Sequence, residues 1–160
     1  MAPRRKPTAE DAEQATALFL RCLASDGDVH ELGRELAELH PKNDTFPGEV
    51  FLRLGADALE VAGVSPTAPL EYEGLGQYLP EFEFRGSEHR KLRFALLATA
   101  ALHGGVEPDL LDEVIWWQTD DFWHYGLVAS VAYIRATADH AGITVPELCA
   151  RLASRQRSRS

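Results

Sequence analysis

With 45% hydrophobic and 26% charged residues among 160, the chain has the composition of one soluble globular domain with a sizeable core. No apolar run approaches the roughly 18 residues needed to cross a bilayer, and no apolar signal-peptide segment follows the basic N-terminus. We therefore expect a cytoplasmic protein with no membrane partner. The excess of arginine over lysine, 13 to 3, favours a bacterial source.

The formal net charge of −9 is unevenly distributed. Residues 7–150 contain 9 basic and 25 acidic side chains, a net of −16, whereas both ends of the chain are rich in arginine. An acidic body repels phosphate backbones, so binding to nucleic acids would require the ends. We expect residues 1–7 to form a disordered basic tail and residues 154–160 a disordered Arg/Ser tail.

The first predicted helix opens with a capping-box pattern, in which Thr8 is followed three residues later by Asp11. Its apolar residues recur at helical spacing, and the turn at Asp26-Gly27-Asp28 ends it. The side predicted to face the core contains Ala12, Ala15, Leu18, Phe19, Cys22 and Leu23.

Two further helices are predicted before residue 64. Asp28 and Glu31 repeat the capping pattern in front of a helix over about 29–39. A helix over Thr45–Ala62 has one apolar stripe and ends at Gly63.

The segment 64–86 contains several prolines and glycines and is the least regular part of the chain. Residues 81–85 alternate with period two, which we interpret as an extended loop that presses Phe82 and Phe84 onto the core. A strongly apolar helix is predicted to follow over about 88–103.

A helix over 120–141 is the centre of the predicted fold. Thr119 is its expected cap and Gly142 its stop, and nearly every position between Tyr125 and Ile134 is apolar. A helix that is apolar on all sides must be surrounded by other elements, and we expect the helix over 88–103 to be its partner. Thr144 caps a last helix whose core side is Val145, Leu148, Cys149 and Leu152.

These signals together predict an all-α fold. One domain over residues 8–153 is expected, with six or seven helices around the two buried ones at about 88–103 and 120–141. Cys22 and Cys149 fall in separate helices far apart in the sequence, so we expect free, buried thiols.

The aromatic segment before the central helix is the best candidate for a partner-binding surface. Trp116 and Trp117 are adjacent and diverge by about 100° on a helix, so the core can fully cover only one ring. An exposed tryptophan with an acidic rim has the composition of interface hot spots. The predicted partner-binding residues are Trp116, Trp117, Asp120, Asp121 and His124.

The same region permits a second interpretation, because carboxylates and histidines at helical spacing can line a metal site or a polar pocket. The residues concerned are Asp109, Asp112, Glu113, Asp120, Asp121 and His124. We favour a structural explanation, since the first turn of a helix favours negative charge and no second helix supplies a matching motif. The alternative is an enzyme or ligand-binding protein with a pocket lined by His103, Trp117, Asp121 and His124.

Two smaller patterns carry positive charge. Arg85, Arg90, Lys91 and Arg93 form a basic cluster near a helix N-terminus, where they oppose the helix dipole and call for an anion or an acidic partner surface. Arg135 and His140 resemble the Arg-x4-His pattern of HEPN-type ribonucleases, which would imply RNA cleavage. Residues five apart on a helix diverge by about 140°, so these two do not converge on one phosphate.

We therefore expect a small acidic protein-interaction or regulatory module that binds a protein partner or further copies of itself. The chain has no nucleophile or phosphate-loop motif, so we predict no catalytic residue, no metal and no cofactor, and favour a non-enzyme. Two alternatives stay open: the enzyme or ligand pocket near 109–124, and nucleic-acid association through the arginine-rich tails.

Overall fold

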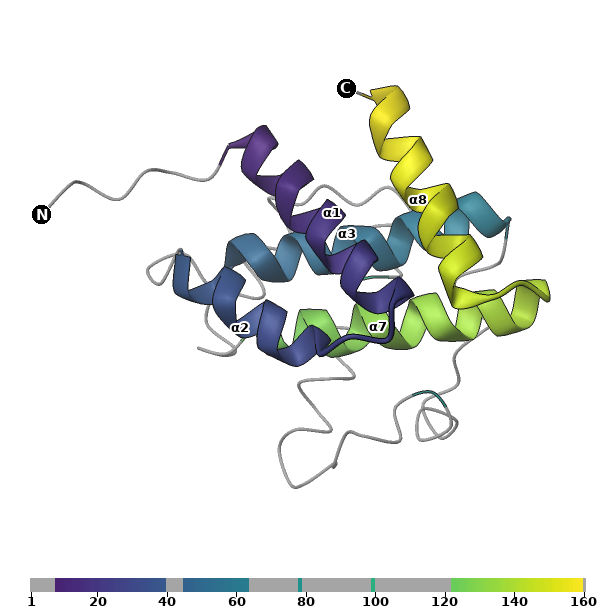
Figure 1. The fold of residues 1–160 in the computed structure, drawn as a ribbon, viewed down its shortest axis with the longest axis horizontal. Coiled ribbons are helices and arrows are strands. Elements are labelled where there is room, and N and C mark those ends of the chain that lie inside the picture. The colour runs from purple at the N-terminus through teal and green to yellow at the C-terminus, as the bar shows by residue number, and fades with distance from the viewer. Residues whose placement is uncertain (1–7, 40–44, 64–77, 79–98, 100–121, 160) are drawn as a thin grey trace, which may run out of the picture.

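The computed structural model describes residues 8–39, 45–63, 78, 99 and 122–159 (Figure 1). Within these ranges the chain forms helices and no strand: α1 (Ala9–Ala24), α2 (Val29–Leu39), α3 (Thr45–Ala62), α7 (Phe122–Ala141) and α8 (Val145–Arg159). The all-α prediction is confirmed for this part of the chain. The segments 64–86 and 88–103 lie outside the described residues, except for Tyr78 and Thr99. The predicted number of six or seven helices is therefore not tested. None of the described helices is long and apolar enough to span a membrane.

Three predicted helix starts are formed by the predicted side chains, at Thr8, Asp28 and Thr144, while the cap predicted at Thr119 lies outside the described residues. The backbone N–H of Thr8 donates to Asp11 Oδ2 at 2.8 Å, and the N–H of Asp11 donates to Thr8 Oγ1 at 3.2 Å, which completes a capping box. At the other two starts the cap side chain accepts from the N–H three residues on, as Asp28 does from Glu31 at 3.0 Å and Thr144 from Glu147 at 3.2 Å.

Helix ends depend on residues that adopt positive φ. Gly63 and Gly142 have φ of +67° and +72° and end α3 and α7 where the sequence predicted. After α1 the left-handed residue is Asp26, with φ of +57°. The next N–H, of Gly27, donates to the Cys22 carbonyl at 2.8 Å, and a Cβ on Gly27 would lie 2.9 Å from Cys22 Sγ. The turn therefore requires glycine at position 27 because of close approach.

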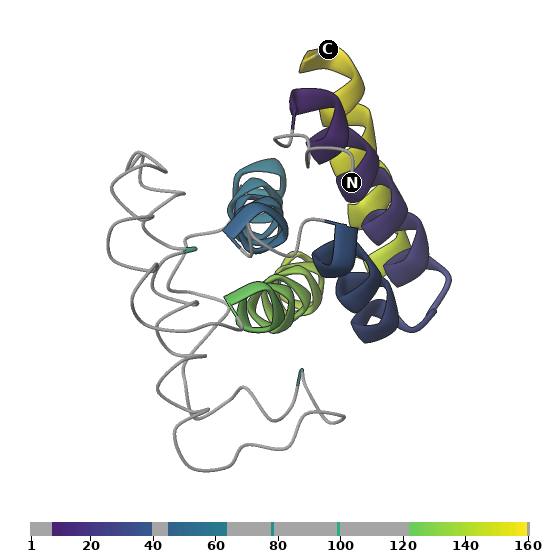
Figure 2. The ribbon, with the colours of Figure 1, turned by 90° about the vertical axis from the view of Figure 1, so that its left-hand side faces the viewer.

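The described helices form two layers. Figure 2 shows α3 and α7 side by side, with α1, α2 and α8 together on one side of this pair. The colours in Figure 1 show that α3 and α7 run in the same direction, whereas α1 and α8 run in opposite directions. The contact between α3 and α7 is the most extensive among the described helices, so this pair is the base on which the others pack.

Helix α7 is buried on all sides, as predicted for the central helix. Every residue from Leu127 to Ile134 is at most 3% exposed. Its main partner among the described helices is α3, while the partner predicted over 88–103 lies outside the described residues apart from Thr99. The sequence predicted only one apolar stripe on α3. Leu52, Gly55 and Ala56, which lie outside that stripe, are also buried, so α3 contacts neighbours on more than one side.

The backbones of α3 and α7 approach closely at Gly55. A Cβ on Gly55 would lie 3.6 Å from Ser130 Cα and 3.5 Å from Tyr133 Cβ, both on α7. It would also lie 2.9 Å from Cγ2 of Thr99, a residue that is fully buried. The absence of a side chain at position 55 therefore allows α3, α7 and Thr99 to meet at one point.

Helix α1 is rotated relative to the prediction. Leu18 was predicted to face the core but is 41% exposed, whereas Thr16 and Leu20 are buried. The buried face combines the row Ala15, Phe19 and Leu23 with the adjacent row Thr16 and Leu20, because α1 contacts α8, α3 and α2 together.

Helix α8 has Leu148, Cys149 and Leu152 in the core and Val145 half-buried, as predicted. It continues through Arg159, so residues 154–159, which the composition predicted to be a tail, are helical in the structure. The side chain of Arg155 is only 19% exposed and its Nη2 lies 2.8 Å from Glu60 Oε2 on α3. This ion pair joins the last turns of two helices.

The two cysteines are free, as predicted, but differ in burial. Cys22 is half-buried and Cys149 is buried. Burial disfavours the charged thiolate and raises the pKa of Cys149 from 9.0 to about 11. Burial likewise raises the pKa of the Tyr133 phenol from 10.0 to about 12.

Substitution of Gly55 by alanine is expected to destabilise the fold by about 1–3 kcal/mol, because the new Cβ overpacks the contact with Thr99. The helix propensity of alanine offsets about 1 kcal/mol of a larger gross cost. Urea melts of Gly55→Ala measure the net effect. Adding Thr99→Ser, which removes the contacting Cγ2, should restore part of the stability. An unchanged or higher stability of Gly55→Ala would show that the two helices are not held at this distance.

The raised pKa of Cys149 predicts alkaline instability. The unfolded thiol ionises near pH 9 while the folded one stays neutral until about pH 11, so its contribution is complete below pH 9 and is lost as the pH rises through 11. The decrease in the free energy of unfolding approaches about 2–3 kcal/mol. Urea melts between pH 8 and 11 should show a shallower decline for Cys149→Ala than for Cys22→Ala. Equal slopes in the two variants would contradict the assignment.

Candidate functional site

Of the residues predicted to bind a partner, the structure describes only His124. Trp116, Trp117, Asp120 and Asp121 lie outside the described residues. The acids at 109, 112 and 113, His103, and the basic cluster of Arg85, Arg90, Lys91 and Arg93 lie outside them as well. These predictions therefore stand as predictions.

His124 lies in the first turn of α7. It is the third residue of the helix and is half-buried, and the positions from Gly126 to Ile134 are buried. Its ring faces that of His30, the second residue of α2, which is also half-buried. The ring centroids are 5.6 Å apart and the ring planes are inclined by 41°.

The helix arrangement explains why these two histidines meet. In Figure 1 the first turn of α2 lies beside the first turn of α7, and each helix then continues in the opposite direction. His30 was not among the site residues predicted from the sequence. Nothing in its local pattern indicates a partner on a helix so far along the chain, so only the tertiary packing of α2 on α7 reveals the pair.

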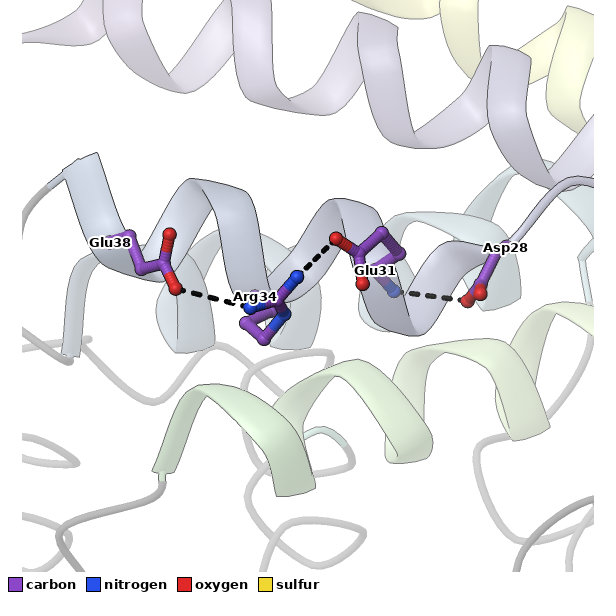
Figure 3. Close-up of polar contacts among 4 residues, drawn as sticks. All are labelled: Asp28, Glu31, Arg34 and Glu38. Carbon is purple, nitrogen blue, oxygen red and sulfur yellow. Dashed lines mark hydrogen bonds and ion pairs between the residues drawn. The ribbon is translucent and has the colours of Figure 1, made fainter.

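The outer face of α2, next to this pair, carries a row of charges (Figure 3). Arg34 lies between two carboxylates and bonds Glu31 on one side and Glu38 on the other, with Nη1 of Arg34 3.4 Å from Glu38 Oε1. The hydrogen bond with Glu31 is the main cause that raises the pKa of Arg34. Exposed pairs of this kind add little stability. With Asp28 and Glu35 also exposed, the face holds four acids and one base, a net charge of −3.

At the other end of α7 two polar side chains hold Tyr78. Nη1 of Arg135 donates to the Tyr78 carbonyl at 2.8 Å, and the Tyr78 hydroxyl donates to Asp139 Oδ2 at 3.1 Å. Desolvation first, and then the bond to Asp139, raise the pKa of Tyr78. Arg135 and Asp139, four residues apart on α7, therefore both contact Tyr78. Of the Arg-x4-His pattern, Arg135 is half-buried and bonds the Tyr78 carbonyl, whereas His140 is exposed.

The buried polar side chains of the described residues are all hydroxyls, at Thr16, Thr99, Ser130 and Thr137. Ser130 donates to the Leu127 carbonyl at 3.0 Å, a bond within α7. The same part of the chain contains no group of three or more His, Cys, Asp or Glu side chains arranged to hold a metal ion. His30 and His124, in contrast, are titratable residues that come from two different helices and are only half-buried.

No protein family matches this chain, and neither the curated proteins nor the solved structures contain a detectable relative.

The contacts of Tyr78 lead to a graded prediction. Tyr78→Phe removes only the bond to the exposed Asp139 and should cost about 0.5–1.5 kcal/mol. Arg135→Ala removes a charge-assisted bond to a backbone carbonyl and should cost about 1.5–3 kcal/mol. Denaturant melts of the two variants provide the comparison. If Tyr78→Phe lowered the free energy of unfolding more than Arg135→Ala, the bond from Arg135 to the Tyr78 carbonyl would not be the main interaction that holds Tyr78 against α7.

Proposed function

We propose that this protein is a protein-interaction or regulatory module that binds its partner at the N-terminal ends of α2 and α7. The observation that carries the proposal is the half-exposed His124, which lies beside His30 in the first turn of the central helix. The predicted residues Trp116, Trp117, Asp120 and Asp121 precede His124 directly in the sequence and would extend this surface.

The rigidity of the scaffold supports this role. From Gly126 to Ala138 α7 is buried at every position except Arg135, which is half-buried. A surface attached to such a helix is held in place before a partner arrives, so little conformational entropy is lost when the complex forms.

The charge of the surface indicates the kind of partner. The outer face of α2 has a net charge of −3 within a body of net −16. Complementary charge steers association and favours correct partners over others. We therefore propose that the partner is a protein with a basic contact surface.

Nucleic-acid association is the less supported alternative. It relies on the arginine-rich ends of the chain, and at the C-terminal end Arg151 pairs with Glu147 at 3.1 Å and Arg155 with Glu60 at 2.8 Å. These two guanidinium groups already bind carboxylates of the same chain. The other alternative is an enzyme or ligand-binding protein with a pocket lined by His103, Trp117, Asp121 and His124. In that case a small-molecule substrate or product, and not a protein, would co-purify with the chain.

Two charge reversals at exposed glutamates test the proposal. Tagged wild-type protein, Glu35→Lys on α2 and Glu13→Lys on α1 are purified from the native host, and co-purifying proteins are identified by mass spectrometry. The partner should accompany wild type and Glu13→Lys. Its affinity for Glu35→Lys, measured by calorimetry, should fall about tenfold or more, which corresponds to roughly 1.4 kcal/mol. His124→Ala should weaken binding as well, and added salt should weaken binding of the wild type.

Several outcomes would overturn the proposal. One is a wild-type protein that retains no partner and sediments as a monomer at all concentrations. Another is a partner lost equally with Glu13→Lys and Glu35→Lys, which would place the contact elsewhere or make it nonspecific. Binding to DNA that disappears when the ends are removed would support the nucleic-acid alternative instead.

A further inference from the structure

The His30–His124 pair brings two imidazoles from different helices into one small space. Both side chains are half-buried, so they are partly shielded from bulk water but still accessible from it. Each comes from the first turn of its helix, so its backbone is fixed by a regular element and not by a loop.

The separation of the rings matches that of two imidazoles on one metal ion. A zinc–nitrogen bond of about 2.0–2.1 Å places the ion roughly 3.2 Å from each ring centroid. At a tetrahedral angle the two centroids are then roughly 5.2 Å apart. The observed 5.6 Å requires only a slightly wider angle or a small shift of one ring.

Simple ring packing gives a similar separation, since packed aromatic rings lie about 4.5–7 Å apart. Imidazole differs from a hydrocarbon ring, however, because a neutral histidine carries a nitrogen lone pair. Two imidazoles on neighbouring helices can therefore both bind one metal ion, which two hydrocarbon rings cannot do.

We propose that His30 and His124 bind one divalent transition-metal ion, of which Zn²⁺ is the representative, and that the ion joins α2 to α7. Imidazole favours zinc, copper and nickel, whereas magnesium and calcium prefer oxygen ligands. Two protein ligands leave positions in the coordination sphere for water, so this is an open site of modest affinity and not a closed structural one. The inference uses the same two histidines as the proposed partner surface but does not require a protein partner, because it is tested on the purified chain alone.

Metal binding at this pair is coupled to folding. His30 and His124 are far apart in the sequence and meet only when α2 packs on α7. An ion held by both binds the folded chain in preference to the unfolded one, so it raises the melting temperature in proportion to the logarithm of its free concentration above the dissociation constant.

Thermal melts of the untagged, full-length protein test the inference. Zn²⁺ should raise the melting temperature steadily with the logarithm of its concentration above the dissociation constant, and Mg²⁺ at the same concentrations should not. His30→Gln and His124→Gln should each remove the response. His140→Gln, at an exposed position on the same helix α7, should retain it and is the matched control.

A second measurement on the unaltered protein covers the case in which a variant folds poorly. Long-range ¹H–¹⁵N spectra report the imidazole nitrogens of all six histidines. The signals of two histidines should shift together on addition of Zn²⁺. These should be the signals of His30 and His124, each identified by its absence from the spectrum of the corresponding variant. No zinc response, a response that survives in the double variant, or shifts at other histidines would overturn the proposal and leave ring packing as the sole role of the pair.

Discussion

The close contact between α3 and α7 at Gly55 is the constraint on which the rest of the described structure depends. Without a side chain at that position, the α3 backbone lies directly against Ser130 and Tyr133, and the fully buried Thr99 meets both helices there. The pair gains a large dispersion contact from this approach. The outer helices then pack on it: α2 contacts α7 and α3, and α8 contacts both through its buried row of Leu148, Cys149 and Leu152.

Local signals in the sequence predicted local structure well. The bounds of α2 and α3 were predicted as they are, and the caps at Thr8, Asp28 and Thr144 are all formed, because capping depends on residues three apart. The burial of α7 was also predictable, since eight successive residues with no charged side chain leave no face for water. Single-stripe patterns were less informative. Leu52, Gly55 and Ala56 lie beside the predicted stripe of α3, and a pattern fitted to one buried face does not include a second one, so this buried side was missed.

The candidate site was predictable only in part. His124 was singled out by its spacing from the acids before it, but His30 becomes meaningful only when α2 lies against α7. Arg135 shows the opposite case. A short resemblance suggested chemistry for it, and its hydrogen bond to the Tyr78 carbonyl gives it a structural role. Sequence spacing identifies neighbours on one helix, whereas a site that spans two helices depends on packing angles and contacts that no local pattern encodes.

The antiparallel course of α1 and α8 places the first turn of α1 and the last turn of α8 at the same end of the described structure (Figure 1). That end lies away from the first turns of α2 and α7. Chain entry and exit points that lie near each other on the surface are the geometry that tolerates insertion of one domain into a loop of another. The described helices are therefore arranged in a way that suits insertion into a host protein, with both connections at one end and the first turns of α2 and α7 away from it.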